Sequence, residues 1–429
     1  MSSAFRDYRT RTFASLSLYN YRLFFIGQCI SQSGTWMQTI AQGLLVLQIT
    51  GSGTALGIVT ALQTLPVLIF GAWGGVFADR MNKRSVLYVT NSIFGIGSLA
   101  TGILTVSGDI QLWMVYIVGL VFGFTKVFDN PARQTFIREM VGNDYLQNAV
   151  SLNSTQMNLA RVIGPSIAGL TAATIGLGAC FIFDAASYAI VFSMLHRMRE
   201  SELHPAKKLA RAKGQLVEGF RYAAETPMLR TILLMMAIIG TFTFEFSVLL
   251  PLFAEFTFHR GAGGYAALTS AMGVGAVVGG LYTASRKVRG TTTLVLSAAL
   301  FGVSVAAASL APTLIFAVAA FVVVGFFSIN FTSLANSTLQ MHTIPAMQGR
   351  VMALWSIAFL GTTPIGGPIM GFVGQHAGAR WGLLLGGIAA IIAAGAGLIS
   401  VSRSGANVIP ATVMQAVPSS GTAKASGAD

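Results

Sequence analysis

Charged residues are scarce in this sequence, making up 10% of its 429 residues. A soluble domain carries about 25% charged residues, so this chain cannot cover an ordinary water-facing surface. Cysteine is also rare: Cys29 and Cys180 both fall within apolar runs, which excludes a disulfide framework. The sequence lacks a glycine-rich phosphate loop, and its five histidines lack ligand spacing. We therefore expect no enzyme, no cofactor and no metal site.

Long apolar runs are what the sequence has instead. Hydrophobic residues make up 54% of the chain, and about twenty apolar residues in a helix cross the roughly 30 Å hydrocarbon core of a bilayer. A transmembrane β-barrel would show alternating segments of about ten residues. We predict an all-α polytopic membrane protein with twelve transmembrane helices, at roughly 22–48, 54–78, 85–106, 111–134, 146–173, 177–196, 228–254, 264–284, 291–309, 312–340, 348–375 and 380–402.

Basic residues set the predicted orientation. All but four of the 27 lysine and arginine residues fall at the termini or in loops on the same side as the termini; the exceptions are Lys126, Arg161, Arg260 and Arg380. Cytoplasmic loops are rich in these residues, so we expect both termini in the cytoplasm and a multi-pass protein of the bacterial cytoplasmic (inner) membrane. This placement beside membrane lipid accounts for the net charge of +13, and we expect no nucleic-acid partner.

An internal repeat divides the chain into halves. The stretch VFGFTKVFDNPARQTFI at 121–137 aligns with VVGFFSINFTSLANSTL at 323–339, and the Gly-Pro pair of ARVIGPSIAG reappears in TTPIGGPIMG, shifted by one. Parallel repeats of this kind are typical of secondary transporters. We predict an N-terminal six-helix bundle at 1–196, a basic cytoplasmic connector at 197–227, a C-terminal six-helix bundle at 228–403 and a disordered tail at 404–429.

The loop after span 2 resembles a signature of the major facilitator superfamily, and the resemblance covers roughly residues 15–403. GGVFADRMNKR matches the signature at Gly75, Asp79, Arg80, Lys83 and Arg84. Asn82 stands where the family has a glycine, and asparagine tolerates the left-handed conformation better than most residues.

Span 5 resembles the antiporter signature of the same superfamily. ARVIGPSIAG matches that signature at Gly164, Pro165 and Gly169, while Ala160 and Ala168 replace two glycines. The glycines and the proline predict a bend that packs closely on neighbouring helices. Together with FDNPARQTFI, this region resembles the enterobactin-exporter and drug:proton antiporter branch of the superfamily.

The resemblance implies a gate on the cytoplasmic side. Asp79 would lie near the start of span 11, where a helix N-terminus attracts negative charge. Asp129 and Arg133 in span 4 are spaced i,i+4 and share one helix face. We predict a network of Asp79, Asp129, Arg133 and Arg80 or Arg84 that breaks when this side opens, with Lys126 paired to Asp129 or Asn130. The alternative is that the basic residues only set the topology.

Ionisable residues within spans are candidates for proton coupling or for a charge in the cavity, because each must be paired or face water. Glu245 lies midway along span 7 among aromatic residues, and the resemblance places that span at the substrate cavity. Its alternative role is a structural carboxylate bonded to a neighbouring helix. Asp184 in span 6 is expected to pair with Arg161 in span 5. Because Thr363 occupies the repeat position of Arg161, Arg161 either pairs with Asp184 or holds an acidic group or substrate.

Polar amides and aromatic side chains are predicted to line the substrate cavity, since that mixture suits large amphipathic molecules. The candidates are Gln28, Gln32, Trp36, Gln38, Phe242, Phe246 and Asn330. The alternative is that the amides bond between helices and the aromatic residues belong to the core.

These features predict a monomeric, proton-driven exporter of small organic molecules, of the multidrug-efflux type, that works by rocking of two bundles. A dedicated siderophore exporter is the alternative within transport. A non-transporting membrane scaffold or receptor on the same fold is the alternative of a different class, although it would have no use for the gate or the intramembrane charges.

Overall fold

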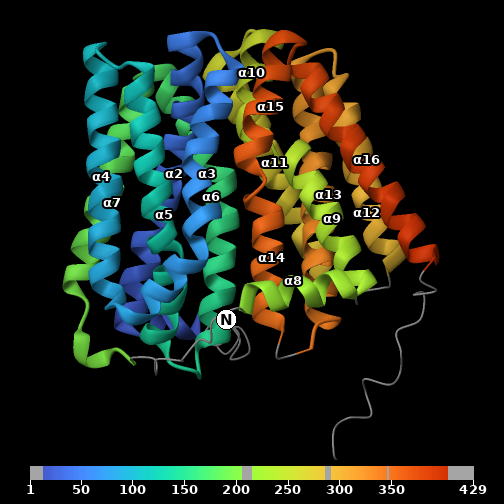
Figure 1. The fold of residues 1–429 in the computed structure, drawn as a ribbon. Coiled ribbons are helices and arrows are strands. Elements are labelled where there is room, and N and C mark those ends of the chain that lie inside the picture. The colour runs from blue at the N-terminus through green and yellow to red at the C-terminus, as the bar shows by residue number, and fades with distance from the viewer. Residues whose placement is uncertain (1–12, 205–214, 286–290, 345–346, 404–429) are drawn as a thin grey trace, which may run out of the picture.

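The protein is helical throughout residues 13–204, 215–285, 291–344 and 347–403, which are the residues described by the structure, a computed structural model. No strand occurs within these ranges. The tail predicted at 404–429 lies outside them. Figure 1 shows the long helices standing side by side in two groups.

The N-terminal group follows a short 3-10 turn, η1 (Ala14–Ser17). Its helices are α2 (Tyr19–Thr50), α3 (Gly53–Arg80), α4 (Lys83–Ser107), α5 (Leu112–Val141), α6 (Leu146–Thr174) and α7 (Leu177–Arg197). The connector contains η2 (Glu200–Glu202) and α8 (Gln215–Glu225). The C-terminal group consists of α9 (Pro227–Phe242), α10 (Phe246–Leu252), the π-helical turn η3 (Phe253–Thr257), α11 (Gly261–Ala284), α12 (Thr291–Ser309), α13 (Leu314–Met341), α14 (Gln348–Leu360), α15 (Thr363–His376) and α16 (Ala379–Arg403).

Within the described residues, ten stretches of helix are long and apolar enough to cross a membrane, which confirms the predicted all-helical, multi-span character. The other two predicted spans fold as α2 and α6, helices of 32 and 29 residues. Both carry more serine, threonine, asparagine and glutamine than their neighbours, so hydropathy alone does not mark them as spans. Two of the ten stretches, Pro227–Thr257 and Gln348–His376, contain helix breaks.

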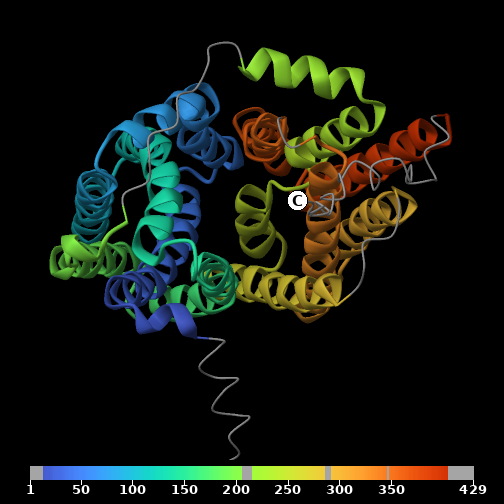
Figure 2. The same ribbon diagram turned by 90° about the horizontal axis from the view of Figure 1, so that it is seen from below.

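Each group is held together by its own helix contacts, and two pairs of helices make the most extensive contacts between the groups. Within the N-terminal group α4 packs on α7, α3 on α5, and α2 on both α6 and α7; within the C-terminal group α11 packs on α13 and α12 on α16. Between the groups, α3 packs on α15 and α6 packs on α11, as Figure 2 shows from below. The predicted repeat relates span 2 to span 8 and span 5 to span 11, so these two contacts are equivalent to each other.

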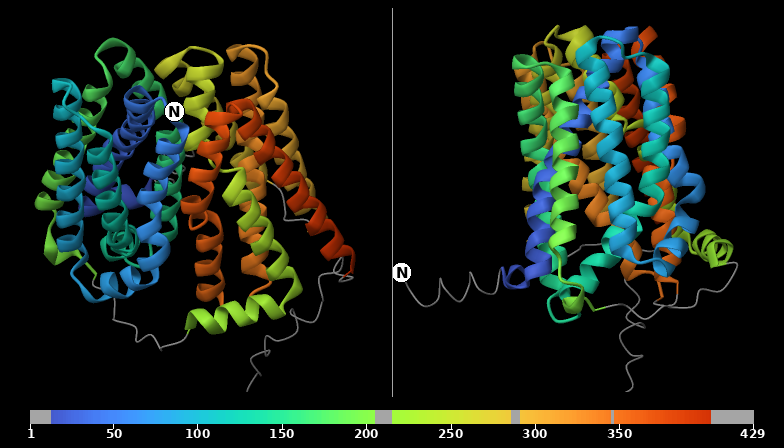
Figure 3. Two further views of the ribbon diagram at one scale, coloured as in Figure 1. Left: turned by 45° about the horizontal axis from the view of Figure 1, so that its top comes forward. Right: turned by 90° about the vertical axis from the view of Figure 1, so that its left-hand side faces the viewer.

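The hydrogen bonds between the groups lie toward one end of the molecule. We call the end where α2 begins and α8 lies the basal face, and the end where α2 stops at Thr50 the distal face (Figures 1 and 3). Near the distal face, Gln375 Oε1 accepts hydrogen bonds from Ser52 Oγ at 2.7 Å and Thr54 Oγ1 at 2.9 Å. Ser166 Oγ on α6 lies 2.9 Å from Ser270 Oγ on α11.

Prolines and glycines explain how the helices approach so closely. A proline within a helix frees the carbonyl four residues earlier, and a membrane offers no water to satisfy it. The carbonyl freed by Pro66 belongs to Leu62, and it lies 2.6 Å from where a Cβ on Gly123 of α5 would be. The reverse also holds: Pro131 of α5 frees the carbonyl of Val127, which lies against Gly74 of α3. In the α3–α5 pair, a glycine on each helix therefore leaves room for the carbonyl oxygen that the proline of the other helix frees, so the two helices pack closely.

This arrangement predicts opposite outcomes for two glycines one turn apart on α5. Gly123→Ala would place a methyl group 2.6 Å from the Leu62 oxygen and 2.9 Å from the Pro66 ring, and we expect a loss of about 1–3 kcal/mol in stability. Gly119→Ala meets only ordinary contacts at 3.6 Å or more, and it should be neutral or stabilising because alanine favours helix. Thermal unfolding in detergent measures both; equal shifts in Tm would contradict the packing argument.

Candidate functional site

Two helix breaks meet in the C-terminal group. The chain leaves the helical path at residues 243–245, between α9 and α10, and again at 361–362, between α14 and α15. The breaks lie against each other, because a Cβ on Gly240 would be 2.6 Å from the Ala358 carbonyl oxygen and 2.9 Å from Thr362 Oγ1. Thr243 Oγ1 donates to the Gly386 carbonyl at 2.7 Å and ties the first break to α16.

Glu245 carries its carboxylate into this junction. The residue is only 1% exposed. A Cβ on Gly366 would lie 2.8 Å from Glu245 Oε1, and one on Gly367 would lie 3.6 Å from Oε2, so the carboxylate lies directly against the glycine pair of α15. Within the described residues neither oxygen accepts a hydrogen bond, although the Thr363 side chain is near enough to interact. The partially positive N-terminal end of α15 is the nearest electrostatic support.

Asp184 is bound by serine, and the predicted pairing with Arg161 is wrong. Ser98 Oγ on α4 donates to Asp184 Oδ2 at 2.6 Å, and Asp184 is 1% exposed. Its other oxygen lies against Gly34, where a Cβ would be 2.9 Å away. Asp184 therefore joins α7 to α4 and α2, which is a structural position that sequence spacing did not indicate.

Arg161 stacks on an aromatic ring instead. Its guanidinium lies 5.8 Å from the centre of the Trp36 ring, and it forms no ion pair with any residue that the structure describes. Its backbone carbonyl, freed by Pro165, lies 3.0 Å from where a Cβ on Gly273 of α11 would be. Arg161 thus stands where the N-terminal group meets the C-terminal group.

The span-5 glycines act as close contacts rather than as a break. The helix α6 continues through Pro165, whereas the related span 11 breaks just before Thr363. A Cβ on Gly164 would lie 2.5 Å from Trp36 Cβ, and Gly169 packs against Ala266 of α11. Both glycines therefore set how closely α6 approaches α2 and α11.

Asp129 and Arg133 pair with each other as predicted from their spacing. Thr90 Oγ1 also donates to Asp129 Oδ1 at 2.8 Å, and Arg133 donates to Gln28 Oε1 at 2.6 Å. Lys126 interacts with the charge of Asp129, as predicted, but the two side chains form no close ion pair, and Lys126 forms none in the described part of the chain.

Lys83 and Arg84, which follow span 2, bind residues that were not part of the predicted network. Lys83 Nζ lies 3.5 Å from Glu139 Oε1. Arg84 donates to Glu200 at 2.5 Å and to the Leu195 carbonyl at 2.7 Å, where it caps the end of α7. Arg84 therefore does not join Asp129. These partners all belong to the N-terminal group or to the connector that follows it.

Other parts of the predicted gate motif are described less fully. The side chains of residues 75–80, which include Gly75, Asp79 and Arg80, lie outside what the structure describes. Asn82 is not left-handed: its φ is −66°, and its side chain accepts a hydrogen bond from Ser85 N to begin α4. An N-cap favours asparagine for its short acceptor side chain.

Three of the four amides predicted to line the cavity take part in hydrogen bonds that link helices. Gln28 binds Arg133 on α5, and Asn330 Oδ1 accepts a hydrogen bond from Thr283 on α11 at 3.1 Å. Gln38 binds Gln42, which in turn accepts a hydrogen bond from Gln63 on α3 at 2.9 Å. These partners favour the interhelical alternative for the amides.

The aromatic candidates divide between core and partly exposed positions. Phe246 is buried against Phe301 and Phe321, so a cavity position for it is wrong. Gln32, Trp36 and Phe242 remain partly exposed.

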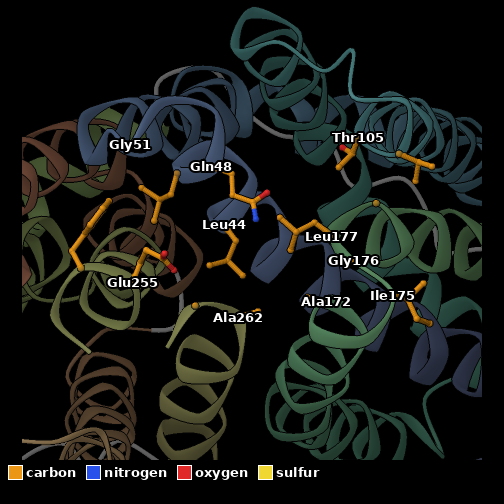
Figure 4. A pocket seen from close by; sticks show the side chains of 15 residues that line it. Leu44, Gln48, Gly51, Thr105, Ala172, Ile175, Gly176, Leu177, Glu255 and Ala262 are labelled. Carbon is orange, nitrogen blue, oxygen red and sulfur yellow. The ribbon is translucent and has the colours of Figure 1, made fainter. Parts of the chain in front are cut away.

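A pocket of about 550 Å³ lies at the distal ends of helices from both groups. Gln48 comes from α2 and Thr105 from α4, while Glu255 and Ala262 come from the C-terminal group. Figure 4 shows Gln48 and Glu255 around this pocket together with the apolar side chains of Leu44 and Leu177. The pocket therefore spans the boundary between the groups at the face where their hydrogen bonds lie.

A family model described as a transmembrane secretion effector matches residues 10–419. This chain belongs to that family of the major facilitator superfamily. Curated relatives include the enterobactin exporter EntS of Shigella flexneri, 24% identical over 82% of this chain and 85% of its own length. The EntS protein of Escherichia coli O1:K1 is 25% identical over the same shares.

Solved structures show the same fold. A bacterial homologue of the human lysosomal transporter Spinster, inward-facing and unoccupied, aligns with a TM-score of 0.71 at 14% identity, covering 92% of this chain and 98% of its own. A bacterial homologue of the iron transporter ferroportin, also inward-facing, aligns with a TM-score of 0.69 at 13% identity, covering 90% and 99%. The chain is therefore a multi-pass membrane transporter and not an enzyme, and the scaffold alternative is set aside.

Sequence reasoning missed one part of this superfamily member's site. The glycine pair at Gly366 and Gly367 was not among the predicted site residues, yet it forms the surface against which the Glu245 carboxylate lies. The signal was present in the sequence as paired glycines beside Pro368 within the uncharged stretch 351–379. Only the fold places these glycines opposite Glu245, which is 121 positions away.

Proposed function

We propose that this transporter exports amphipathic organic molecules across the bacterial cytoplasmic membrane in exchange for protons. The observation that carries the proposal is the Glu245 carboxylate, which is buried at the junction of two broken helices, beside the Thr363 side chain, and forms no ion pair with any cation of the described residues. A buried carboxylate without a partner is costly as an anion, so it suits a group that binds a proton in one conformation and releases it in another.

The proposed topology has twelve spans, with α2 and α6 included and the basal face in the cytoplasm. The basic residues around the start of α4 and the end of α7 lie at the basal face, as the positive-inside rule requires. Both α2 and α6 are long enough to cross the bilayer at 1.5 Å per residue, and each buries some of its polar side chains, such as Gln28 and Gln42 of α2 and Gln156 of α6. Both termini are then cytoplasmic.

Alternating access follows from how the two groups meet. Their hydrogen bonds lie near the distal face, while the described ion pairs of Lys83, Arg84 and Arg133 join residues of the N-terminal half of the chain. This conformation is therefore held closed at the outside. Rocking that separates α3 from α15 would expose Glu245, because Gly367 lies against both Glu245 and Gly57. The distal pocket would then be the exit.

A dedicated siderophore exporter is the second candidate, since the curated relatives are named as enterobactin exporters. The two candidates share the mechanism and differ in the breadth of substrates. Transport of enterobactin together with refusal of unrelated amphipathic dyes would favour the dedicated exporter.

Proton exchange can be measured in liposomes that contain the purified protein and a pH-sensitive dye. Adding enterobactin outside should drive substrate inward and protons outward, so the lumen becomes alkaline. Protein-free liposomes are the control. Accumulation of substrate without any change in lumen pH would reject proton coupling while leaving transport intact.

A further inference from the structure

Lys126 and Arg161 are two cations within the membrane-spanning part of the N-terminal group, and neither forms an ion pair with a carboxylate of the described residues. The carboxylates nearby are engaged elsewhere. Asp129 binds Arg133 and Glu139 binds Lys83. Asp184 accepts a hydrogen bond from Ser98 through Oδ2, while its Oδ1, without a partner among the described residues, lies against Gly34. Neither Lys126 nor Arg161 forms an ion pair with a residue of the described chain. Charges in this position are costly and mark sites of function.

The fold itself does not require these charges. The repeat places Ser328 at the position of Lys126 and Thr363 at the position of Arg161. The C-terminal half therefore builds the two corresponding spans with neutral side chains, although span 11 breaks just before Thr363 where α6 is continuous. A structural role shared by both halves would call for similar residues, so the cations serve something that the N-terminal half does alone.

Lys126 points away from lipid. On α5 the exposed apolar residues Ile117, Val121, Phe124 and Phe128 form one stripe, which faces the membrane. By the 100° turn of each helical residue, Lys126 lies on the opposite side. Arg133, two turns along on that opposite side, reaches across to Gln28 of α2. Lys126 therefore faces the interior between α2 and α5.

Arg161 approaches the same interior from another helix. The lipid-facing stripe of α6 contains Leu159, Ile163, Ile167 and Leu170, and Arg161 lies on the other side with its guanidinium over Trp36. The hydrogen bond between Gln28 and Arg133 sets the relative height of α2 and α5. From the level of that hydrogen bond toward the distal face, Lys126 is about 10 Å away along α5 and Trp36 is about 12 Å away along α2. Because the Arg161 guanidinium lies over Trp36, Lys126 and Arg161 lie at one level.

We propose that Lys126 and Arg161 form a binding site for anionic aromatic substrates, with the Trp36 ring as its apolar surface. The ammonium group supplies a point charge, and the guanidinium supplies a planar donor already held by stacking on tryptophan. A substrate anion would provide the missing counter-charge for both groups. The inference rests on the proposed export function and narrows its substrate class.

Three naphthalene probes with fixed charge test this selectivity. They are 2-naphthalenesulfonate, 2-naphthalenemethanol and (2-naphthylmethyl)trimethylammonium, which share a ring and carry a negative, neutral and positive group. Equilibrium dialysis against the full chain in nanodiscs, with empty nanodiscs as the blank, gives each Kd. We expect the sulfonate to bind at least about tenfold more tightly than the alcohol, and the cation to bind most weakly.

Variants separate charge recognition from simple ring binding. Lys126→Gln and Arg161→Gln should each weaken the sulfonate about tenfold and leave the alcohol nearly unchanged, while Lys126→Arg should keep the preference. Arg221→Gln, at an exposed position of α8, removes an equal charge and should change nothing. Equal affinity for the anion and the cation, or parallel weakening of all three probes, would overturn the proposal.

The outcome is distinguishable from failure of the export function. Proton-coupled transport without any charge preference in binding would reject the anion site alone. A clear preference for the sulfonate in a protein that moves no protons would reject the proposed exchange and keep the site.

Discussion

Glu245→Gln is expected to abolish proton-coupled transport while leaving the protein folded. Glutamine has nearly the same shape as the protonated carboxyl group, so it fits against Gly366 and Gly367, and it cannot release a proton. Because the native carboxylate accepts no hydrogen bond from the described residues, the substitution breaks no such bond. In dye-loaded liposomes, the substrate-driven pH change should fall to that of protein-free liposomes.

Glu255→Gln is the matched control, because it makes the same chemical change at the other glutamate of the same span. Glu255 lies at the distal pocket, partly exposed, where water can solvate its charge. We expect nearly normal coupling in this variant. A normal pH response in Glu245→Gln, or equal losses in both variants, would show that Glu245 is not the coupling carboxylate.

A disulfide between α6 and α11 is expected to stop transport completely and reversibly. Ser166 Oγ and Ser270 Oγ are 2.9 Å apart across the boundary between the two groups, which suits the short Cβ–Cβ distance of a disulfide. In a background with Cys29→Ser and Cys180→Ala, Ser166→Cys with Ser270→Cys should cross-link on oxidation. The bond would hold the distal side closed, so substrate could not leave, and a reducing agent should restore transport.

A second cysteine pair controls for cross-linking as such. Thr231 Oγ1 on α9 and Ser400 Oγ on α16 are 2.5 Å apart, and both lie within the C-terminal group. A disulfide between Thr231→Cys and Ser400→Cys should form equally well and leave transport nearly normal, because rigid-body rocking does not separate these helices. Full transport by the oxidised Ser166→Cys, Ser270→Cys protein would mean that α6 and α11 need not separate.

Partners of the charged residues were the least predictable part of the site. The spacing of Asp129 and Arg133 correctly indicated their pair, because an i,i+4 relation is fixed by one helix. Asp184 and Arg161 lie on adjacent helices, yet Asp184 binds Ser98, 86 positions away. Pairing between helices depends on their rotation and height, and neither quantity is contained in a spacing.

Helix breaks were also beyond the reach of hydropathy. Each predicted segment falls on helix, but spans 7 and 11 are interrupted at 243–245 and 361–362. The Gly-Pro motif predicted a bend in span 5, and there α6 runs through Pro165 without the interruption that spans 7 and 11 show. A glycine or proline shows where a helix can yield, while the neighbouring helices decide whether it does.

The sequence by itself determined that this chain lies in a membrane, that its spans are helical and that it resembles the major facilitator superfamily. These conclusions depend on local composition and on motifs within a single loop or helix, so they require no knowledge of contacts. Only the tertiary structure decided that Glu245 lies against the glycine pair of α15, that Arg84 caps α7, and that Lys126 and Arg161 lack carboxylate partners. Such facts arise when helices distant in sequence pack together, because packing alone determines which polar group meets another.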